Sequence, residues 1–315
     1  LDWLVETVAE GVAQACAALQ PCRLGFGHQA VFGLSHNRRV VMRDGTTRCH
    51  GSFTDPAALH LEGPIDPELA VIAAVAPDGR RLGALVNFAC HPTHAGPDDF
   101  ITAGWPGAMV CAMQAHGWPV GLFLNGAAGN LHHSNPCGPS LDMEPLGQAL
   151  AERVEDLASN LDWRDEVKLA TRRTTIQLPY RGLSEAELTG QVRGAQRFRP
   201  ELYARVIPQV VERIRQRGTQ PAEIQVHQLD EYALVSIPAE YFAELGLRIK
   251  EECHPCHALV VGFANGMVGY VPTREAFQRG GYETTFMATS RMAYESGDLL
   301  ADAAIALIGE DVTVR

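Results

Sequence analysis

The stretch LVNFACHPTHAG, residues 85–96, brings reactive side chains to the end of an apolar run. The run stops at Cys90, and the imidazoles of His91 and His94 follow it. In open α/β sheets, ligands bind beyond the carboxyl ends of strands, where loops converge on a rigid frame. A histidine at such a place is either a metal ligand or a hydrogen-bonded structural residue. The stretch therefore makes His91 a candidate metal ligand and leaves the structural alternative open.

Two other apolar runs stop in the same abrupt way at polar or small residues: FLNGAAGNLHH (123–133) and VSIPAE (235–240). A fourth candidate stretch is GFANGMVGYVPT (262–273). Together the four stretches supply imidazole, carboxylate and phenol groups, which suit a borderline metal such as zinc better than a nucleotide phosphate. The glycine-rich residues 126–129 do not form a P-loop, because no Gly-Lys-Ser/Thr follows them. A zinc site is thus the chemistry that these residue types favour.

The elements that position these residues are predicted from the apolar pattern. Apolar runs at 69–76 and 82–90 flank a Pro-Asp-Gly turn, which predicts a β-hairpin, and residues 223–237 predict a second one. Between residues 82 and 125 strands alternate with a helix, which favours parallel neighbours. We therefore expect an α/β fold in which residues 1–315 form a single domain, with a mixed β-sheet flanked by helices.

Apolar residues at three- and four-residue spacing predict helices over 2–19, 106–116, 143–158, 240–252 and 290–309. Residues 183–217 are charged and also helical in period. We expect this segment to be a peripheral helical insertion, broken into pieces at Pro200 and Pro208.

The composition, with 46% hydrophobic and 20% charged residues, is that of a soluble globular enzyme. The net charge of −11 argues against attraction to nucleic acid or to anionic lipid. No stretch reaches the roughly 18 apolar residues of a membrane span. We expect a soluble protein with no nucleic-acid partner and no transmembrane segment; a homo-oligomer stays open, and a cytoplasmic location is slightly favoured.

The cysteines do not follow the pattern of a disulfide-stapled domain. Cys16, Cys90 and Cys111 lie within apolar patterns, so we expect buried thiols there. CHPCH, residues 253–257, matches the haem-attachment pattern Cys-x-x-Cys-His and half of a zinc ribbon. No second Cys/His pair has ribbon spacing, so a disulfide or a pair of free thiols at Cys253 and Cys256 is favoured over haem.

The stretches NFACHPTHAG, ITAGWPGAM, FLNGAAGNLHH, SIPAEYF and FANGMVGYVPTREAFQRGGYET occur in an order and spacing that resembles the neutral/alkaline non-lysosomal ceramidase family. The HNRR sequence at 36–39 is also similar, and the resemblance runs from about residue 20 to the C-terminus. That family hydrolyses an amide bond with one zinc ion held by two histidines, a glutamate and a tyrosine. The resemblance implies that His91, Glu240 and Tyr270 are metal ligands.

The resemblance also implies catalytic roles, because a zinc-activated water makes a serine or cysteine nucleophile unnecessary. Tyr270 would ligate the metal or donate to the developing oxyanion. His94 and His132 are candidate general acid/base residues, with a surface or structural role as the equal alternative. The candidate substrate-binding residues are Arg38, Arg39, Asn125 and Gly126; the arginines equally suit local backbone capping.

The sequence departs from the family pattern in several places. The first zinc histidine of the family, in a Thr-His-Thr-His-Ser-Gly motif, has no counterpart here. We expect a fourth ligand from an upstream segment, which we favour, from His94, His132 or His133, or from a neighbouring subunit. Gly126 stands where larger ceramidases carry serine, and Asn130 and Gly104 stand where aspartate is common.

These features favour a zinc-dependent hydrolase that cleaves an amide bond in an N-acyl or ceramide-like substrate of sphingolipid type. The sequence is too short for the C-terminal lipid-binding domain of true ceramidases, so ceramide itself is weakly implied. Two alternatives stay open: a non-catalytic homologue that acts as a binding protein, and a zinc lactone or ester hydrolase.

Overall fold

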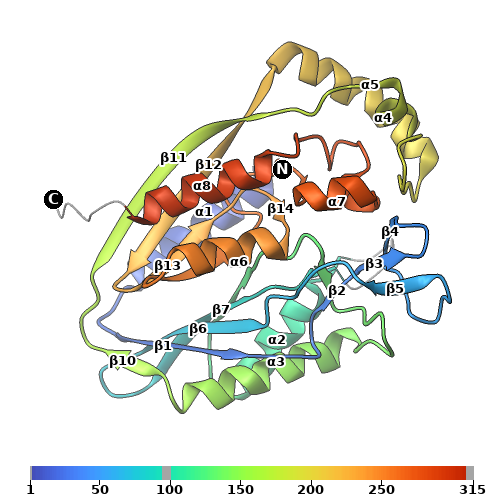
Figure 1. Ribbon diagram of the computed structural model, residues 1–315. Coiled ribbons are helices and arrows are strands. Elements are labelled where there is room, and N and C mark those ends of the chain that lie inside the picture. The colour runs from blue at the N-terminus through green and yellow to red at the C-terminus, as the bar shows by residue number, and fades with distance from the viewer. Residues whose placement is uncertain (1, 94–100, 310–315) are drawn as a thin grey trace.

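The computed structural model describes residues 2–93 and 101–309, and they form a mixed α/β fold around two main sheets (Figure 1). The first sheet has the order β10-β1-β6-β7-β8 and the second has the order β11-β12-β13-β15. Each sheet is mixed, because one edge pair is parallel and the other pairs are antiparallel. The expected α/β class with mixed strand pairing is confirmed, although the strands divide between two sheets where the sequence predicts one.

The strands of the first sheet are β1 (Arg23–Ala30), β6 (Glu68–Val75), β7 (Arg81–Phe88), β8 (Gly121–Asn125) and β10 (Asp162–Arg164). Those of the second are β11 (Leu169–Pro179), β12 (Thr219–Leu229), β13 (Tyr232–Ser236) and β15 (His257–Val261). Short strands form a β4-β3-β5 sheet and the pairs β2-β9 and β14-β16. Their bounds are β2 (His36–Asn37), β3 (Arg39–Met42), β4 (Thr47–Cys49), β5 (Ala58–Leu61), β9 (Leu131–His132), β14 (Glu240–Tyr241) and β16 (Tyr270–Val271).

Both predicted hairpins are confirmed. Strands β6 and β7 pair antiparallel with Leu69 opposite Phe88, and β12 and β13 pair antiparallel with Leu229 opposite Tyr232. The predicted parallel neighbour is also present, since β8 runs parallel to β7. These local pairings follow from apolar runs interrupted by turn residues.

Helices cover both main sheets (Figure 1). Helices α2 (Gly104–Ala115) and α3 (Met143–Ala158) pack on the first sheet, and α6 (Ala243–Glu252) and α8 (Ser296–Gly309) pack on the second. The apolar spacing in α3 explains its packing, because Leu146, Leu150 and Val154 recur every four residues, share one face of the helix and are all buried. Two short helical elements, α7 (Arg274–Arg279) and η1 (Tyr282–Thr284), lie between β16 and α8 in the chain.

The segment expected to be a helical insertion contains α4 (Glu185–Thr189) and α5 (Pro200–Arg217). Pro200 begins α5, where a missing N–H costs nothing, but Pro208 lies inside the helix, so the predicted break there is wrong. A proline inside a helix costs about 3 kcal/mol. Buried side chains on both sides of Pro208, including Ile207 and Val210, pack in one cluster with Phe286 and offset that cost.

Helix α1 (Asp2–Ala17) confirms the first predicted helix, but its described residues are all exposed. The Cys16 thiol is therefore exposed, as is Cys111, and both predictions of burial are wrong, whereas Cys90 is buried. Periodicity identified the apolar face of α1 without showing whether another element covers it. In the part of the chain that the structure describes, no helix combines the length and apolar character of a membrane span.

Candidate metal centre

The carboxyl ends of strands from both sheets meet at one place. The Asn87 amide on β7 donates to the carbonyl of Val260 on β15 at 3.0 Å. The Gly262 N–H, just after β15, donates to the carbonyl of Asn125 at the end of β8 at 2.9 Å. The loops that follow β7, β8, β13 and β15 therefore converge, as the four candidate stretches suggest.

Three predicted ligands lie side by side in this region. The His91 Nε2 atom is 3.0 Å from Glu240 Oε2 and 3.4 Å from the Tyr270 hydroxyl. All three residues are buried. Glu240 and Tyr270 are also direct register partners in the parallel pair β14-β16, so the backbone itself holds the carboxylate and the phenol together.

Hydrogen bonds to the backbone fix the orientation of His91. Its Nδ1 lies 2.6 Å from the carbonyl oxygen of Ala128 and 3.1 Å from that of Leu131. Carbonyl oxygens only accept, so Nδ1 carries a proton and the Nε2 atom faces the Glu240 carboxylate. This arrangement is typical of metal-binding histidines, in which the second ring nitrogen donates to a carbonyl. Nitrogen, carboxylate and phenol donors at this spacing fit a zinc ion.

Arg38 orients the hydroxyl of Tyr270. Its guanidinium donates to the Tyr270 oxygen at 3.2 Å, to the Gly129 carbonyl at 3.0 Å and to Glu283 at 2.8 Å. Burial raises the pKa of Tyr270 well above its usual value, even though the Arg38 charge acts in the opposite direction. The side chain is therefore a neutral phenol at neutral pH, able to donate a hydrogen bond.

Each guanidinium nitrogen of Arg39 donates a hydrogen bond to another group of the protein. It donates to Glu283 at 2.5 Å, to the Gly280 carbonyl at 2.7 Å and to Glu62. Burial raises the pKa of Glu283, but Arg39 and Arg38 outweigh burial and lower this pKa to about 2. The predicted substrate-binding role stays a prediction for both arginines, and this geometry favours Arg38 because only Arg38 contacts Tyr270.

The glycine-rich loop after β8 requires its glycines because of close backbone approaches. A Cβ atom at Gly126 would lie 2.9 Å from the Cα of Ala89, and one at Gly129 would lie 2.5 Å from the carbonyl oxygen of Glu240. Neither position accepts a larger residue without a shift of the loop. Asn125 precedes them, and both polar atoms of its amide are buried without a hydrogen-bond partner among the described residues.

The other histidines lie at different distances from the centre. The ring of His132 is 6.2 Å from that of His91, and its Nδ1 is hydrogen-bonded to Ser134 at 2.9 Å. Burial and the neighbouring His133 lower the pKa of His132, so the imidazole is neutral. The ring of His133 lies 4.1 Å from that of His132. His94 lies outside the described residues. Within those residues, no third His, Cys, Asp or Glu joins His91 and Glu240 with ligand atoms all inside 4.8 Å.

Two residues near the centre were missed by sequence reasoning. Glu283 is completely buried beneath the arginines, and its GGYET stretch lay within the most specific part of the resemblance without being singled out. His50 has its ring 4.7 Å from His132 and perpendicular to it, and partial desolvation together with the Arg38 charge lowers its pKa. Only its position in a loop marks His50 in the sequence, so no pattern would have found it.

Apolar side chains border the centre. The Phe263 side chain is partly exposed and meets the His91 ring edge-on at 6.3 Å. Tyr282 lies against Tyr270, with ring centroids 5.6 Å apart. Tyr282 also lines a cavity of about 280 Å³ together with Phe198, Leu202, Tyr203 and Met287. A mainly apolar recess, which Arg199 and Thr289 also line, thus lies next to the polar cluster.

Comparisons with known proteins show which proteins this chain is similar to. No protein-family model matches the chain. A neutral ceramidase from Pseudomonas aeruginosa is 22% identical, over 96% of this chain and 54% of the relative. The crystal structure of neutral ceramidase from the same organism matches with a TM-score of 0.69 at 19% identity, over 96% of this chain and 54% of the other. A structure described as a ceramidase complexed with C2 matches with a TM-score of 0.67 at 18% identity, over 94% and 54% of the two chains. The chain spans about half the length of these relatives. It is distantly homologous to neutral ceramidase and shares the neutral ceramidase fold over almost all of its own length.

Proposed function

We propose that the chain is a zinc-dependent hydrolase that cleaves the amide bond of an N-acyl, lipid-like substrate. His91 and Glu240 would hold the metal, and Tyr270 would lie beside it as a hydrogen-bond donor. The observation that carries the proposal is the convergence of these three side chains. Glu240 Oε2 lies 3.0 Å from His91 Nε2, and the Tyr270 hydroxyl lies 3.4 Å from the same atom. The distant homology to a neutral ceramidase supports an amide as the bond that is cleaved.

The residues around the centre have distinct tasks in this proposal. When bound, zinc supplies a Lewis acid that polarises a carbonyl and lowers the pKa of water. Ala128 and Leu131 hold the His91 proton on Nδ1 and leave Nε2 for the metal. Tyr270, a neutral phenol aligned by Arg38, donates a hydrogen bond to the oxygen on which negative charge develops.

The apolar recess beside Tyr282 supports an acyl group as the substrate portion next to the amide. Phe263 packs against His91, and Tyr282 packs against Tyr270. The cavity of about 280 Å³ lies just below the roughly 300 Å³ at which ligand pockets begin, so it would take only a short acyl chain. Aliphatic carbons buried there contribute roughly 0.8 kcal/mol per methylene.

The test uses protein stripped of metal with a chelator and then reloaded with Zn²⁺. His91→Ala and Glu240→Gln should each lose one bound zinc per chain and at least about 10²-fold of the rate on a fluorescent short-chain N-acyl amide. The matched controls His116→Ala and Glu144→Gln replace exposed residues elsewhere and should change neither quantity.

The same assay separates the alternatives. If the protein binds zinc and hydrolyses the ester analogue but not the amide, it is an ester or lactone hydrolase and the amide proposal is wrong. A folded protein that loses no zinc on substitution of His91 and Glu240, and that hydrolyses neither substrate, would contradict the proposal and favour a binding protein.

A further inference from the structure

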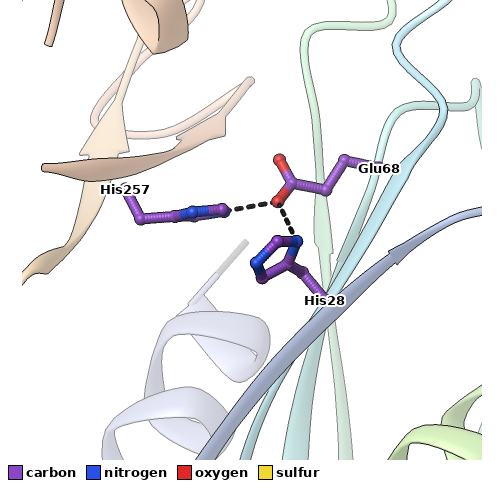
Figure 2. A group of neighbouring side chains, drawn as sticks. All are labelled: His28, Glu68 and His257. Atoms are coloured by element: carbon purple, nitrogen blue, oxygen red, sulfur yellow. Dashed lines mark hydrogen bonds and ion pairs between the residues drawn. The ribbon is translucent and has the colours of Figure 1, made fainter. Parts of the chain in front are cut away.

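We propose a second metal site, for a first-row divalent cation such as Zn²⁺, held by His28, Glu68 and His257 (Figure 2). One ligand atom from each residue lies within 4.8 Å of the other two. The three come from strands of both main sheets, so a bound ion would bridge the sheets. This site shares no residue with the centre around His91, and the inference does not depend on the proposed hydrolase function.

Strand register brings the three residues together. On β1 and β6, Ala30 pairs with Glu68, and His28 is two residues before Ala30, so His28 and Glu68 share one face of the first sheet. His257 begins β15 in the second sheet. Figure 2 shows both imidazoles directed at the same Glu68 oxygen. His28 Nδ1 is 3.5 Å from Glu68 Oε1, and His257 Nε2 is hydrogen-bonded to that atom.

Lys250 fixes the direction of the carboxylate. Its ammonium group lies 2.6 Å from Glu68 Oε2 and 2.6 Å from Asp66 Oδ2. The second oxygen of Glu68 is thereby engaged, and Oε1 remains directed at the imidazoles. Asp66 compensates the charge of Lys250, so the cluster of two imidazoles, Glu68, Asp66 and Lys250 has a net charge of about −1 with neutral histidines. That charge favours a cation.

Aromatic packing holds the two sheets in place beside the site. Phe26, two residues before His28 on β1, stacks on Tyr232 with ring centroids 4.7 Å apart. Tyr232 is the register partner of His257. The imidazoles of His28 and His257 are themselves 4.3 Å apart, centroid to centroid. Ligands held by packing before the ion arrives lose little conformational freedom on binding.

The donor set is one that zinc uses. Two histidines and one glutamate, with a remaining position for water, form the three-ligand set of several zinc enzymes. In the absence of a cation, the His257 Nε2–H donates to Glu68, and ligation through Nε2 would move that proton to Nδ1 of the same ring.

In this proposal the last residue of the CHPCH motif is a metal ligand. His257 is its last residue, and it faces Glu68 rather than a haem cavity. Cys253 is buried and Cys256 is partly buried, and both are free thiols. Within the described residues, neither thiol joins the three-residue group.

The test is a calorimetric Zn²⁺ titration of chelator-stripped protein in a His91→Ala, Glu240→Gln background, which removes the first centre. This background should still bind one zinc per chain. Adding His28→Ala, or Glu68→Gln, should weaken that binding at least tenfold, whereas adding His116→Ala should not. His28 has a side chain that is 48% exposed, so His28→Ala is expected to fold even where His257→Ala does not.

The visible spectrum of Co²⁺-loaded protein gives an independent readout, because ligand-field bands require coordination and not merely folding. Failure of the background protein to bind Zn²⁺ or Co²⁺ would overturn the second site and leave the first untouched. Conversely, zinc that survives substitution at His91 and Glu240 but is lost with His28→Ala would support this inference while contradicting the metal centre of the proposed hydrolase.

Discussion

The substitution Glu283→Gln tests the ion-pair network beneath the candidate metal centre. Glu283 is completely buried and accepts hydrogen bonds from Arg38 at 2.8 Å and from Arg39 at 2.5 Å. Its pKa falls from 4.5 to about 2 in the folded protein. A shift of that size corresponds to roughly 3 kcal/mol of stability at pH 7. Glutamine keeps the volume but removes the charge, so the free energy of unfolding should fall by about 3 kcal/mol, within the range for breaking a buried pair.

The pH dependence gives the sharper measurement. A carboxyl whose pKa is lowered by folding stabilises the protein above its unfolded pKa, and this stabilisation is lost as pH falls toward the folded pKa. The difference in unfolding free energy between the original protein and Glu283→Gln should therefore decrease to about 2 kcal/mol near pH 3.5. Urea unfolding followed by circular dichroism at several pH values measures it.

The exposed pair of Arg153 and Asp156 provides the control. Asp156→Asn should cost at most about 0.5 kcal/mol. A loss below about 1 kcal/mol for Glu283→Gln at pH 7, or a loss that does not vary with pH, would refute the account of a charged Glu283 held by two arginines.

Two further predictions concern the centre and the loop beside it. Tyr270→Phe should lower kcat on the N-acyl amide by about 10²-fold or more while zinc stoichiometry is retained, because the phenol donates to developing charge; zinc loss equal to that of His91→Ala would instead make the phenol an essential ligand. Gly126→Ser should reduce the free energy of unfolding by about 1–3 kcal/mol, because a Cβ would lie 2.9 Å from Ala89 Cα. Gly138→Ser, where the nearest atom would be 3.6 Å away, should be close to neutral in the same urea experiment, and equal losses in the two variants would contradict the packing argument.

The fold could be predicted from the sequence as far as local pairing reaches. The β6-β7 and β12-β13 hairpins follow from apolar runs separated by turns, and neither depends on distant residues. Which hairpin joins which sheet depends on contacts such as Phe26 with Tyr232, which no local pattern encodes. The division into two sheets was therefore beyond prediction. Helix continuity through Pro208 was missed for the same reason, since packing on Phe286 decides it.

The candidate site was predictable where a motif carried it. His91, Glu240 and Tyr270 were named from strand ends and family resemblance, and the structure places Glu240 and Tyr270 within hydrogen-bonding distance of His91. Arg38 and Arg39 look like a charged surface pair in the sequence. Their burial depends on Glu283, more than 240 positions away along the chain.

The convergence of loops from both sheets links the centre to the completeness of folding. His91 follows a strand of the first sheet, whereas Glu240 and Tyr270 follow strands of the second. A partly folded chain with only one sheet formed would thus hold at most two of the three donors. If the proposed zinc binds at this centre, its retention would report that both halves have assembled, and its release during purification or heat stress would report that they have separated.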